Sequence, residues 1–130
     1  MRTYLFAYLA ALATLAVLDA VWLGFIARDL YKDRLGPLLL DQPKWGVAIL
    51  FYLVHIAGIV VFPLGLAGSW LSALLYGALF GAVVYSAYDV TNLATLRGWS
   101  ATITVVDLLW GSFVSALSCL AAYLVLRSAA

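Results

Sequence analysis

Charge is the scarcest property of this sequence. Only 10% of its 130 residues are charged, whereas soluble domains carry about 25%. The six acidic residues include no glutamate, and the single cysteine excludes an internal disulfide. A net charge of +1 gives no basic surface for nucleic acid. In contrast, 67% of the residues are hydrophobic, more than a soluble core of this length can bury, so the composition predicts a polytopic membrane protein.

Long apolar runs divide the chain into candidate membrane spans. A spanning helix needs about 20 mainly apolar residues. Four segments meet this requirement, at residues 4–27, 45–66, 70–91 and 101–126. The first run is longer than the core of a signal peptide and no clear cleavage site follows it, which favours an uncleaved transmembrane helix. We therefore expect one membrane domain, residues 1–130, with an all-α fold: an antiparallel bundle of four transmembrane helices.

The connections between these runs predict a surface segment, a hairpin and the orientation of the chain in the membrane. Residues 28–44 place the apolar Leu38–Leu40 between charges, as in a segment that lies on the bilayer surface. Pro63 near the end of the second run predicts a kink or an early stop, and the short turn that follows predicts a tight hairpin with the third helix. Five of the seven basic residues lie in the connections at 28–44 and 92–100. The positive-inside rule then predicts cytoplasmic connections and outside termini.

Four ionisable side chains interrupt the apolar runs. They are Asp19, His55, Asp89 and Asp107. At about 1.5 Å of rise per helical residue, all four lie in the half of the membrane next to the basic connections. Ionisable groups within membranes face the bundle interior or a water-filled cavity, and they are functional candidates by default. The sequence therefore predicts one polar layer to which all four helices contribute.

Helical spacing predicts which faces of the helices turn inward. Residues four apart share a face, and G-x-x-x-G lets a second helix approach closely. Two such stripes combine small residues with the aspartates: Gly77, Gly81, Tyr85 and Asp89 on the third helix, and Asp107, Gly111, Ser115 and Cys119 on the fourth. Trp22 shares a face with Asp19, and Tyr52 lies with His55. Both stripes are expected to face other helices.

The candidate ligand-binding residues combine this layer with its polar and aromatic neighbours: Asp19, Trp22, Tyr52, His55, Tyr85, Asp89, Asn92, Asp107 and Trp110. Simpler roles stay open, because Asp19 and Asp107 can lock helices together and Asp89 can end its helix near the headgroups. His55 alone is often a packing residue. Trp45 and Trp99 are expected at the membrane interface. One histidine with several aspartates can bind a divalent metal, but it cannot supply the two-histidine site of an iron oxygenase, and no H-E-x-x-H is present. We therefore predict no metal site, and no cofactor is identified.

A short motif occurs twice. LDAVWLGF (18–25) and VDLLWGSF (106–113) both contain D-x-x-W, which is weak evidence for an inverted repeat on antiparallel helices. Trp22 lies about 4.5 Å nearer the basic side than Asp19, whereas Trp110 lies about 4.5 Å deeper than Asp107. We therefore expect that the two tryptophans do not form a symmetric ring pair.

Together with YDVTNLATLRGW (88–99), these motifs resemble the DUF2177 family of small predicted bacterial membrane proteins. The resemblance extends over nearly the whole chain. It implies four helices in this order, in a multi-pass protein of the bacterial inner membrane, and it implies no activity. The residues at the family's motif positions are Asp19, Trp22, Asp89, Asn92, Thr95, Trp99, Asp107, Trp110 and Gly111.

Three functions fit these features. The favoured one is binding or transport of a small or lipid-like ligand by a small carrier, in which protonation of Asp19 and Asp107 competes with a cationic ligand. The second is acid–base catalysis on a lipid or isoprenoid, although no nucleophile elbow or metalloprotease motif is present. The third is an accessory subunit of a larger membrane complex. Besides the lipid bilayer, a homodimer or such a complex stays open as a partner.

Overall fold

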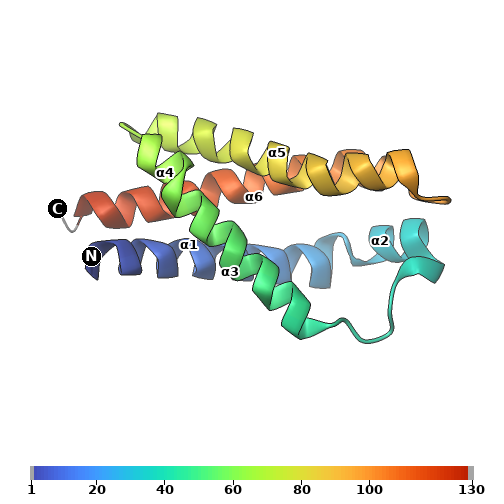
Figure 1. Ribbon diagram of the computed structural model, residues 1–130. Helices are drawn as coiled ribbons and strands as arrows, with labels where there is room; N and C mark the ends of the chain where they lie inside the picture. The colour runs from blue at the N-terminus through green and yellow to red at the C-terminus, as the bar shows by residue number, and fades with distance from the viewer. Residues whose placement is uncertain (1, 129–130) are drawn as a thin grey trace.

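The computed structural model describes residues 2–128, which are almost entirely helical (Figure 1). The elements are α1 (Arg2–Val21), a π-helical turn (Trp22–Ile26), α2 (Arg28–Leu35), a 3-10 turn (Gly36–Leu38), α3 (Trp45–Val61), α4 (Pro63–Leu66), α5 (Trp70–Thr95) and α6 (Ala101–Ser128). Four stretches are long and apolar enough to cross a membrane: Arg2–Ile26, Trp45–Leu66, Trp70–Thr95 and Ala101–Ser128. The all-α polytopic fold is confirmed, and these helices imply a lipid bilayer environment. Helix α5 runs past residue 91, where the sequence predicted its end.

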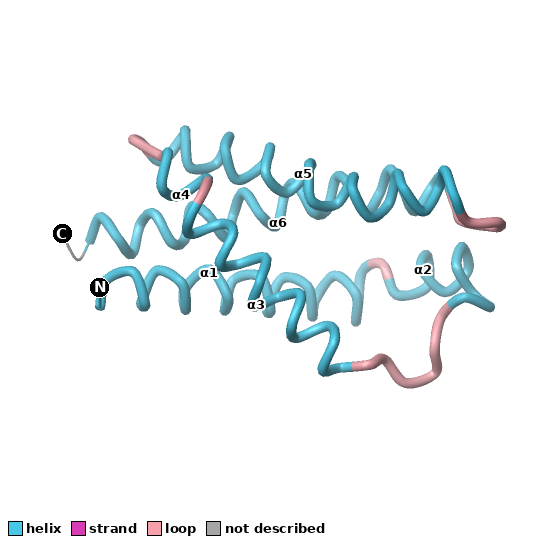
Figure 2. Tube along the Cα trace, in the orientation of Figure 1, coloured by secondary structure: helices cyan, strands magenta, loops and turns pink. Residues whose placement is uncertain are grey.

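Helix α6 is the central element of the bundle. It packs most extensively against α5 and next against α1, while α3 crosses these helices diagonally (Figure 1). Both termini lie at one end of the molecule. The long connection before α3 and the turn between α5 and α6 lie at the other end (Figure 2). Because α6 borders the other long helices, it contributes to each polar cluster described below.

The contact between α5 and α6 is made by the small-residue stripes, as the spacing predicted. The buried residues of α5 are Ala73, Gly77, Gly81, Tyr85 and Asp89. A Cβ on Gly77 would lie 2.8 Å from the Cβ of Cys119, and one on Gly81 would collide with the carbonyl oxygen of Gly111. The G-x-x-x-G motif therefore brings two helices of the same chain together, and it gives no argument for a dimer.

Helices α3 and α5 form a hairpin that is tight only at its turn. Pro63 ends α3 and starts α4, which packs against α5. Beyond the turn α3 diverges from α5 and packs against α1, and aromatic rings lie between α3 and α5. The Phe80 ring covers Gly58 and stacks on His55, and the Phe51 and Tyr85 rings meet edge to face. This separation opens a cleft beside the polar residues.

Local chemistry fixes both ends of α5. Ser69 and Ser72 form a capping box at the start of the helix. After its end, Gly98 has a φ of 81°, in the left-handed region that favours glycine. Trp99 then donates a hydrogen bond to Thr104 at 3.1 Å. Trp99 therefore links the turn to the first residues of α6.

Candidate functional site

Asp19 joins three helices through hydrogen bonds. Its side chain lies on the inner face of α1 and is 7% exposed. The Tyr52 hydroxyl of α3 donates to Oδ2 at 2.5 Å, and the Trp110 Nε1 of α6 donates to Oδ1 at 2.7 Å. Hydrogen bonds to a carboxylate are among the stronger ones in proteins. With both oxygens engaged by neutral donors, Asp19 acts as a junction between α1, α3 and α6.

Asp107 is held by a residue of the connecting segment. The Tyr31 hydroxyl of α2 donates to its Oδ1 at 2.6 Å, and Trp22 Nε1 donates to the Tyr31 oxygen at 3.3 Å. Burial and the bond to Asp107 raise the pKa of Tyr31 well above its usual range, so the hydroxyl stays a donor at neutral pH. The sequence pattern did not predict a role for Tyr31, although Tyr31 is the one aromatic residue in the charged stretch RDLYKDRL.

The two D-x-x-W motifs interlock. The Trp22 and Trp110 rings stack with their centroids 4.5 Å apart and their planes 5° from parallel. The expectation that they form no ring pair was wrong, because it compared axial positions on regular helices and neglected the reach of an indole. In addition, Trp22 begins a π-helical turn, which interrupts the regular α-helical spacing. Each tryptophan is connected by hydrogen bonds to the aspartate of the other motif. Trp110 donates directly to Asp19, and Trp22 donates to Tyr31, which donates to Asp107.

Asp89 lies inside the bundle without a hydrogen-bond partner. Its side chain is 0% exposed, and neither carboxyl oxygen is bonded within residues 2–128. The Tyr85 ring packs against Gly111, so one turn further along both helices Asp89 lies opposite Asp107 of α6. The simpler interpretation, that Asp89 ends its helix, was wrong, since α5 continues for more than a turn beyond it. Buried polar groups are rarely unpaired, so Asp89 is a candidate for contact with a ligand.

His55 belongs to a separate contact. Its Nε2 lies 2.9 Å from the Ser115 hydroxyl, and its ring stacks between those of Phe51 and Phe80 at centroid distances of 5.3 and 5.5 Å. The Nδ1 atom is buried and has no partner in the described part of the chain. A histidine that activates a serine is normally oriented by a third group. Without one, this pair is best understood as a link between α3 and α6.

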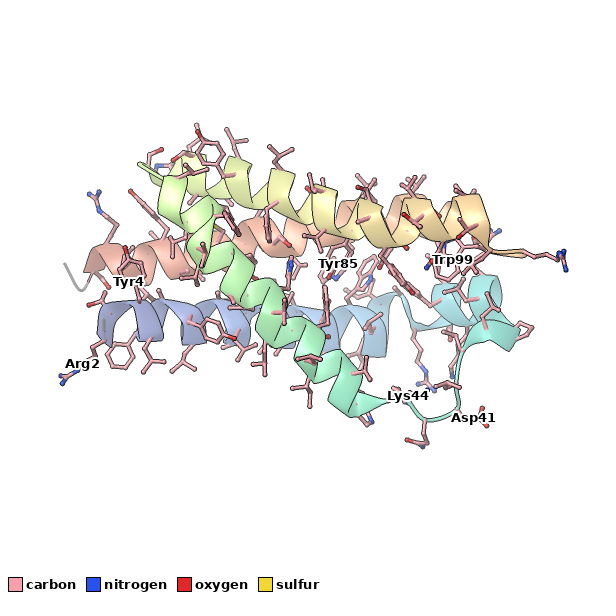
Figure 3. All side chains as sticks on the ribbon, viewed as in Figure 1. Arg2, Tyr4, Asp41, Lys44, Tyr85 and Trp99 are labelled. Atoms are coloured by element: carbon pink, nitrogen blue, oxygen red, sulfur yellow. The ribbon has the colours of Figure 1, made fainter. Side chains whose placement is uncertain are left out.

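A cleft opens between α3, α5 and α6. Its volume is about 360 Å³, and its lining residues are Phe51, Val84, Tyr85, Tyr88 and Asp107. Phe51 is 40% exposed and Tyr88 57%, so the mouth lies on the outer surface of the helices. Tyr85 points from α5 into the space that α3 crosses (Figure 3). The wall is aromatic and aliphatic, and Asp107 is the one charged residue in it.

The comparisons with known proteins agree with the motifs. Residues 4–124 match the family described as "Predicted membrane protein (DUF2177)". The chain belongs to this family. Comparison with curated proteins and with solved structures gives no match. The resemblance predicted from the three motifs is therefore confirmed over nearly the whole length of this DUF2177 protein.

The predicted site residues of this DUF2177 protein separate into distinct groups. Asp19, Tyr52 and Trp110 form one cluster. Trp22 and Asp107 form another through Tyr31, with Asp89 opposite Asp107 in the register of α5 and α6. Tyr85 lines the cleft, His55 bonds Ser115, and Asn92 is half-buried near Tyr88. No group of three or more His, Cys, Asp or Glu side chains within residues 2–128 is arranged to hold a metal ion.

Proposed function

We propose that this membrane protein binds a small or lipid-like ligand in the cleft between α3, α5 and α6. The proposal rests on one observation, an apolar cleft of about 360 Å³ with the carboxylate of Asp107 in its wall. Ligand pockets typically measure about 300–1,000 Å³ and combine apolar walls with a few polar groups. The apolar body of the ligand would contact Phe51 and Val84, and its polar end would contact Asp107.

The use of the carboxyl oxygens supports Asp107, rather than Asp19, as the contact for the polar end. Both oxygens of Asp19 accept hydrogen bonds from neighbouring helices. In Asp107, Tyr31 occupies Oδ1, and the second oxygen accepts no hydrogen bond from residues 2–128. A ligand can bond to that oxygen without breaking a contact that holds helices together. Asp19, Tyr52 and Trp110 then support the site without contacting the ligand.

The position of the cleft supports entry from the bilayer on one side. Asp107 lies in the part of α6 that follows the connection containing Arg97, and five basic residues surround this end of the bundle. By the positive-inside rule this side is cytoplasmic, and we take the membrane to be the bacterial inner membrane. Transport to the other side would require a polar path through its mainly apolar half. Binding is therefore the better-supported activity.

Photo-crosslinking tests this site. An alkyl diazirine probe with a polar head group is added to the protein in phosphatidylcholine nanodiscs, and labelled peptides are mapped by mass spectrometry. Labelling should concentrate on Phe51, Val84 and Tyr88. Val84→Trp fills the cleft and should remove most of this labelling. Leu75→Trp, on an exposed position of the same helix, should leave it intact.

Two results would contradict the proposal. One is uniform labelling of all exposed positions on α5, which would indicate ordinary contact with bilayer-dissolved probe. The other is equal loss of labelling in Val84→Trp and Leu75→Trp, which would indicate that the cleft has no special role.

A further inference from the structure

We infer that the ligand of this cleft carries a primary ammonium group, which Asp107 and Asp89 hold together. The inference rests on the proposed binding function and names the class of ligand. It starts from Asp89, the unpaired carboxyl group of α5, which the cleft alone does not explain.

Asp89 is fully buried, next to the lining of the cleft rather than in it. Asp89 follows Tyr85, a lining residue, by four positions, so the two share a face of α5. Across the contact between α5 and α6, the Tyr85 ring packs against Gly111. One turn further along both stripes Asp89 lies opposite Asp107, which is also in the lining. A primary ammonium has three N–H donors and no acceptor. Such a group bound at Asp107 can also donate to the unpaired oxygens of Asp89.

The carboxyl groups of Asp89 and Asp107 have no cationic partner within residues 2–128. The one hydrogen-bond donor to Asp107 within residues 2–128 is the neutral Tyr31 hydroxyl, and Asp89 has none. Two adjacent carboxylates repel each other, and a buried charge is stable only when it is paired and hydrogen-bonded. A cation between them removes both penalties. An alcohol can donate only one hydrogen bond, and a carboxylate can donate none.

The lining favours an organic cation over a metal ion. Calcium and magnesium bind six or more oxygen ligands, whereas two carboxyl groups are the acidic groups available here. The described residues contain no cluster suited to a metal. An alkylammonium also fits the walls, because Phe51 and Val84 can contact its hydrocarbon chain. The rings of Tyr85 and Tyr88 can contact the positive charge through cation–π interactions.

A series of probes with one chain and different head groups tests this inference. Octylamine, octanol and octanoate are titrated by calorimetry into phosphatidylcholine nanodiscs with and without the protein, near neutral pH, where an alkylamine is protonated. Octylamine should bind at least about tenfold more tightly than octanol, because hydrogen bonds to charged groups contribute that much. Octanoate should bind most weakly.

Isosteric variants identify the two carboxyl groups. Asp107→Asn and Asp89→Asn should each remove most of the preference for octylamine over octanol. A helical circular dichroism spectrum and a monodisperse gel-filtration profile in detergent, both as in the unmodified protein, show that the variants are folded. Asp41→Asn makes the same change of charge at an exposed position of the connection, away from Tyr85 (Figure 3), and should have no effect. A preference that survives in both cleft variants would overturn the inference.

The outcomes separate this inference from the proposed function. Equal binding of octylamine and octanol, with both blocked by Val84→Trp, would reject the ammonium group and keep the cleft. Failure of all three probes to bind would reject both. Nanodiscs containing phosphatidylethanolamine distinguish two sources of the amine. Weaker octylamine binding there would identify a lipid head group as the competitor, and unchanged binding would identify a free amine; either result supports an ammonium ligand.

Discussion

Two aspartate sites in this protein contain the same motif but differ in how their oxygens are used. At Asp19, both carboxyl oxygens accept hydrogen bonds, from Tyr52 and Trp110. At the other site, Asp107 accepts one bond from Tyr31, and Asp89 beside it accepts none within residues 2–128. The first site joins three long helices. The second lies beside a cleft and is tied to the connecting segment.

This difference shows that an aspartate in an apolar helix does not by itself indicate a ligand. Asp19 is explained by the donors around it, since its bonds hold α1, α3 and α6 together. Asp89 has no such explanation, and an unpaired buried carboxyl group is costly. The informative feature is therefore the unpaired oxygen, and the following substitutions test whether the two sites differ as described.

The largest expected effect comes from separating α5 from α6. Gly81→Leu places a side chain where the Gly111 carbonyl and the Ser115 side chain already lie. Overpacking of this kind typically costs about 3 kcal/mol. We expect a matching loss in the free energy of unfolding in detergent micelles, measured by SDS titration. Because Asp89 and Asp107 lie on opposite sides of this contact, octylamine binding should be lost as well.

The matched control for this substitution is Gly46→Leu. No atom lies within 4 Å of a Cβ built on Gly46, so the same change should have little effect on stability there. If Gly81→Leu were as stable as Gly46→Leu, the close contact of the two helices would be wrong.

The next largest loss of stability should come from Asp19, whose two carboxyl oxygens both accept hydrogen bonds. Asp19→Ala leaves the Tyr52 hydroxyl and the Trp110 N–H without their acceptor. Each unmade buried bond costs about 1 kcal/mol, so the loss of unfolding free energy should be about 2 kcal/mol. Asp19→Asn keeps one acceptor oxygen and should lose less. Equal losses in the two variants would show that negative charge, rather than hydrogen bonding, matters at this position.

A substitution at Asp89 should raise the free energy of unfolding instead of lowering it. Asp89→Leu replaces a buried carboxyl group that lacks partners with an apolar side chain of similar size. Replacing buried charges by well-packed apolar groups is often stabilising, and we expect a gain of about 1 kcal/mol in the ligand-free protein. The same unfolding assay measures it. Destabilisation as large as that of Asp19→Ala would mean that the two sites share one structural role.

The sequence could predict the helices and the faces they bury. The runs of apolar residues define four spans, and the four-residue spacing of Gly77, Gly81, Tyr85 and Asp89 identifies the buried face of α5. This succeeds because helical periodicity is a local property. The order of the motifs also identified the family.

The partners of each side chain could not be predicted in the same way. Spacing gives the face of a residue but not the donor opposite it, so Asp19 and Asp107 looked equivalent. Tyr31 reaches Asp107 only because the chain turns after Ile26, and it lies in a charged segment that no periodicity connects to the bundle. The cleft depends on the diagonal path of α3, with aromatic rings between α3 and α5.

The smallest expected effect tests the hydrogen bond that attaches Asp107 to the connecting segment. Tyr31→Phe removes one hydroxyl group and keeps the ring, so it breaks the bond to Asp107 and frees Oδ1. The cost should be about 0.5 kcal/mol, since the bond joins a partly exposed helix to the bundle. Hydrogen exchange of the α2 amides should then accelerate about twofold, while α1 and α6 amides stay unchanged.

Tyr52→Phe is the matched change at Asp19, because it removes the hydroxyl group that donates a hydrogen bond to that carboxyl group. It should accelerate exchange in α3 and leave α2 as it was. If both variants loosened the same helices, the two aspartates would belong to one cooperative network, joined through the stacked rings of Trp22 and Trp110. If each variant loosened only its own helix, the two sites would be independent. Asp19 would then have a structural role, and Asp89 beside Asp107 would still be available to a ligand.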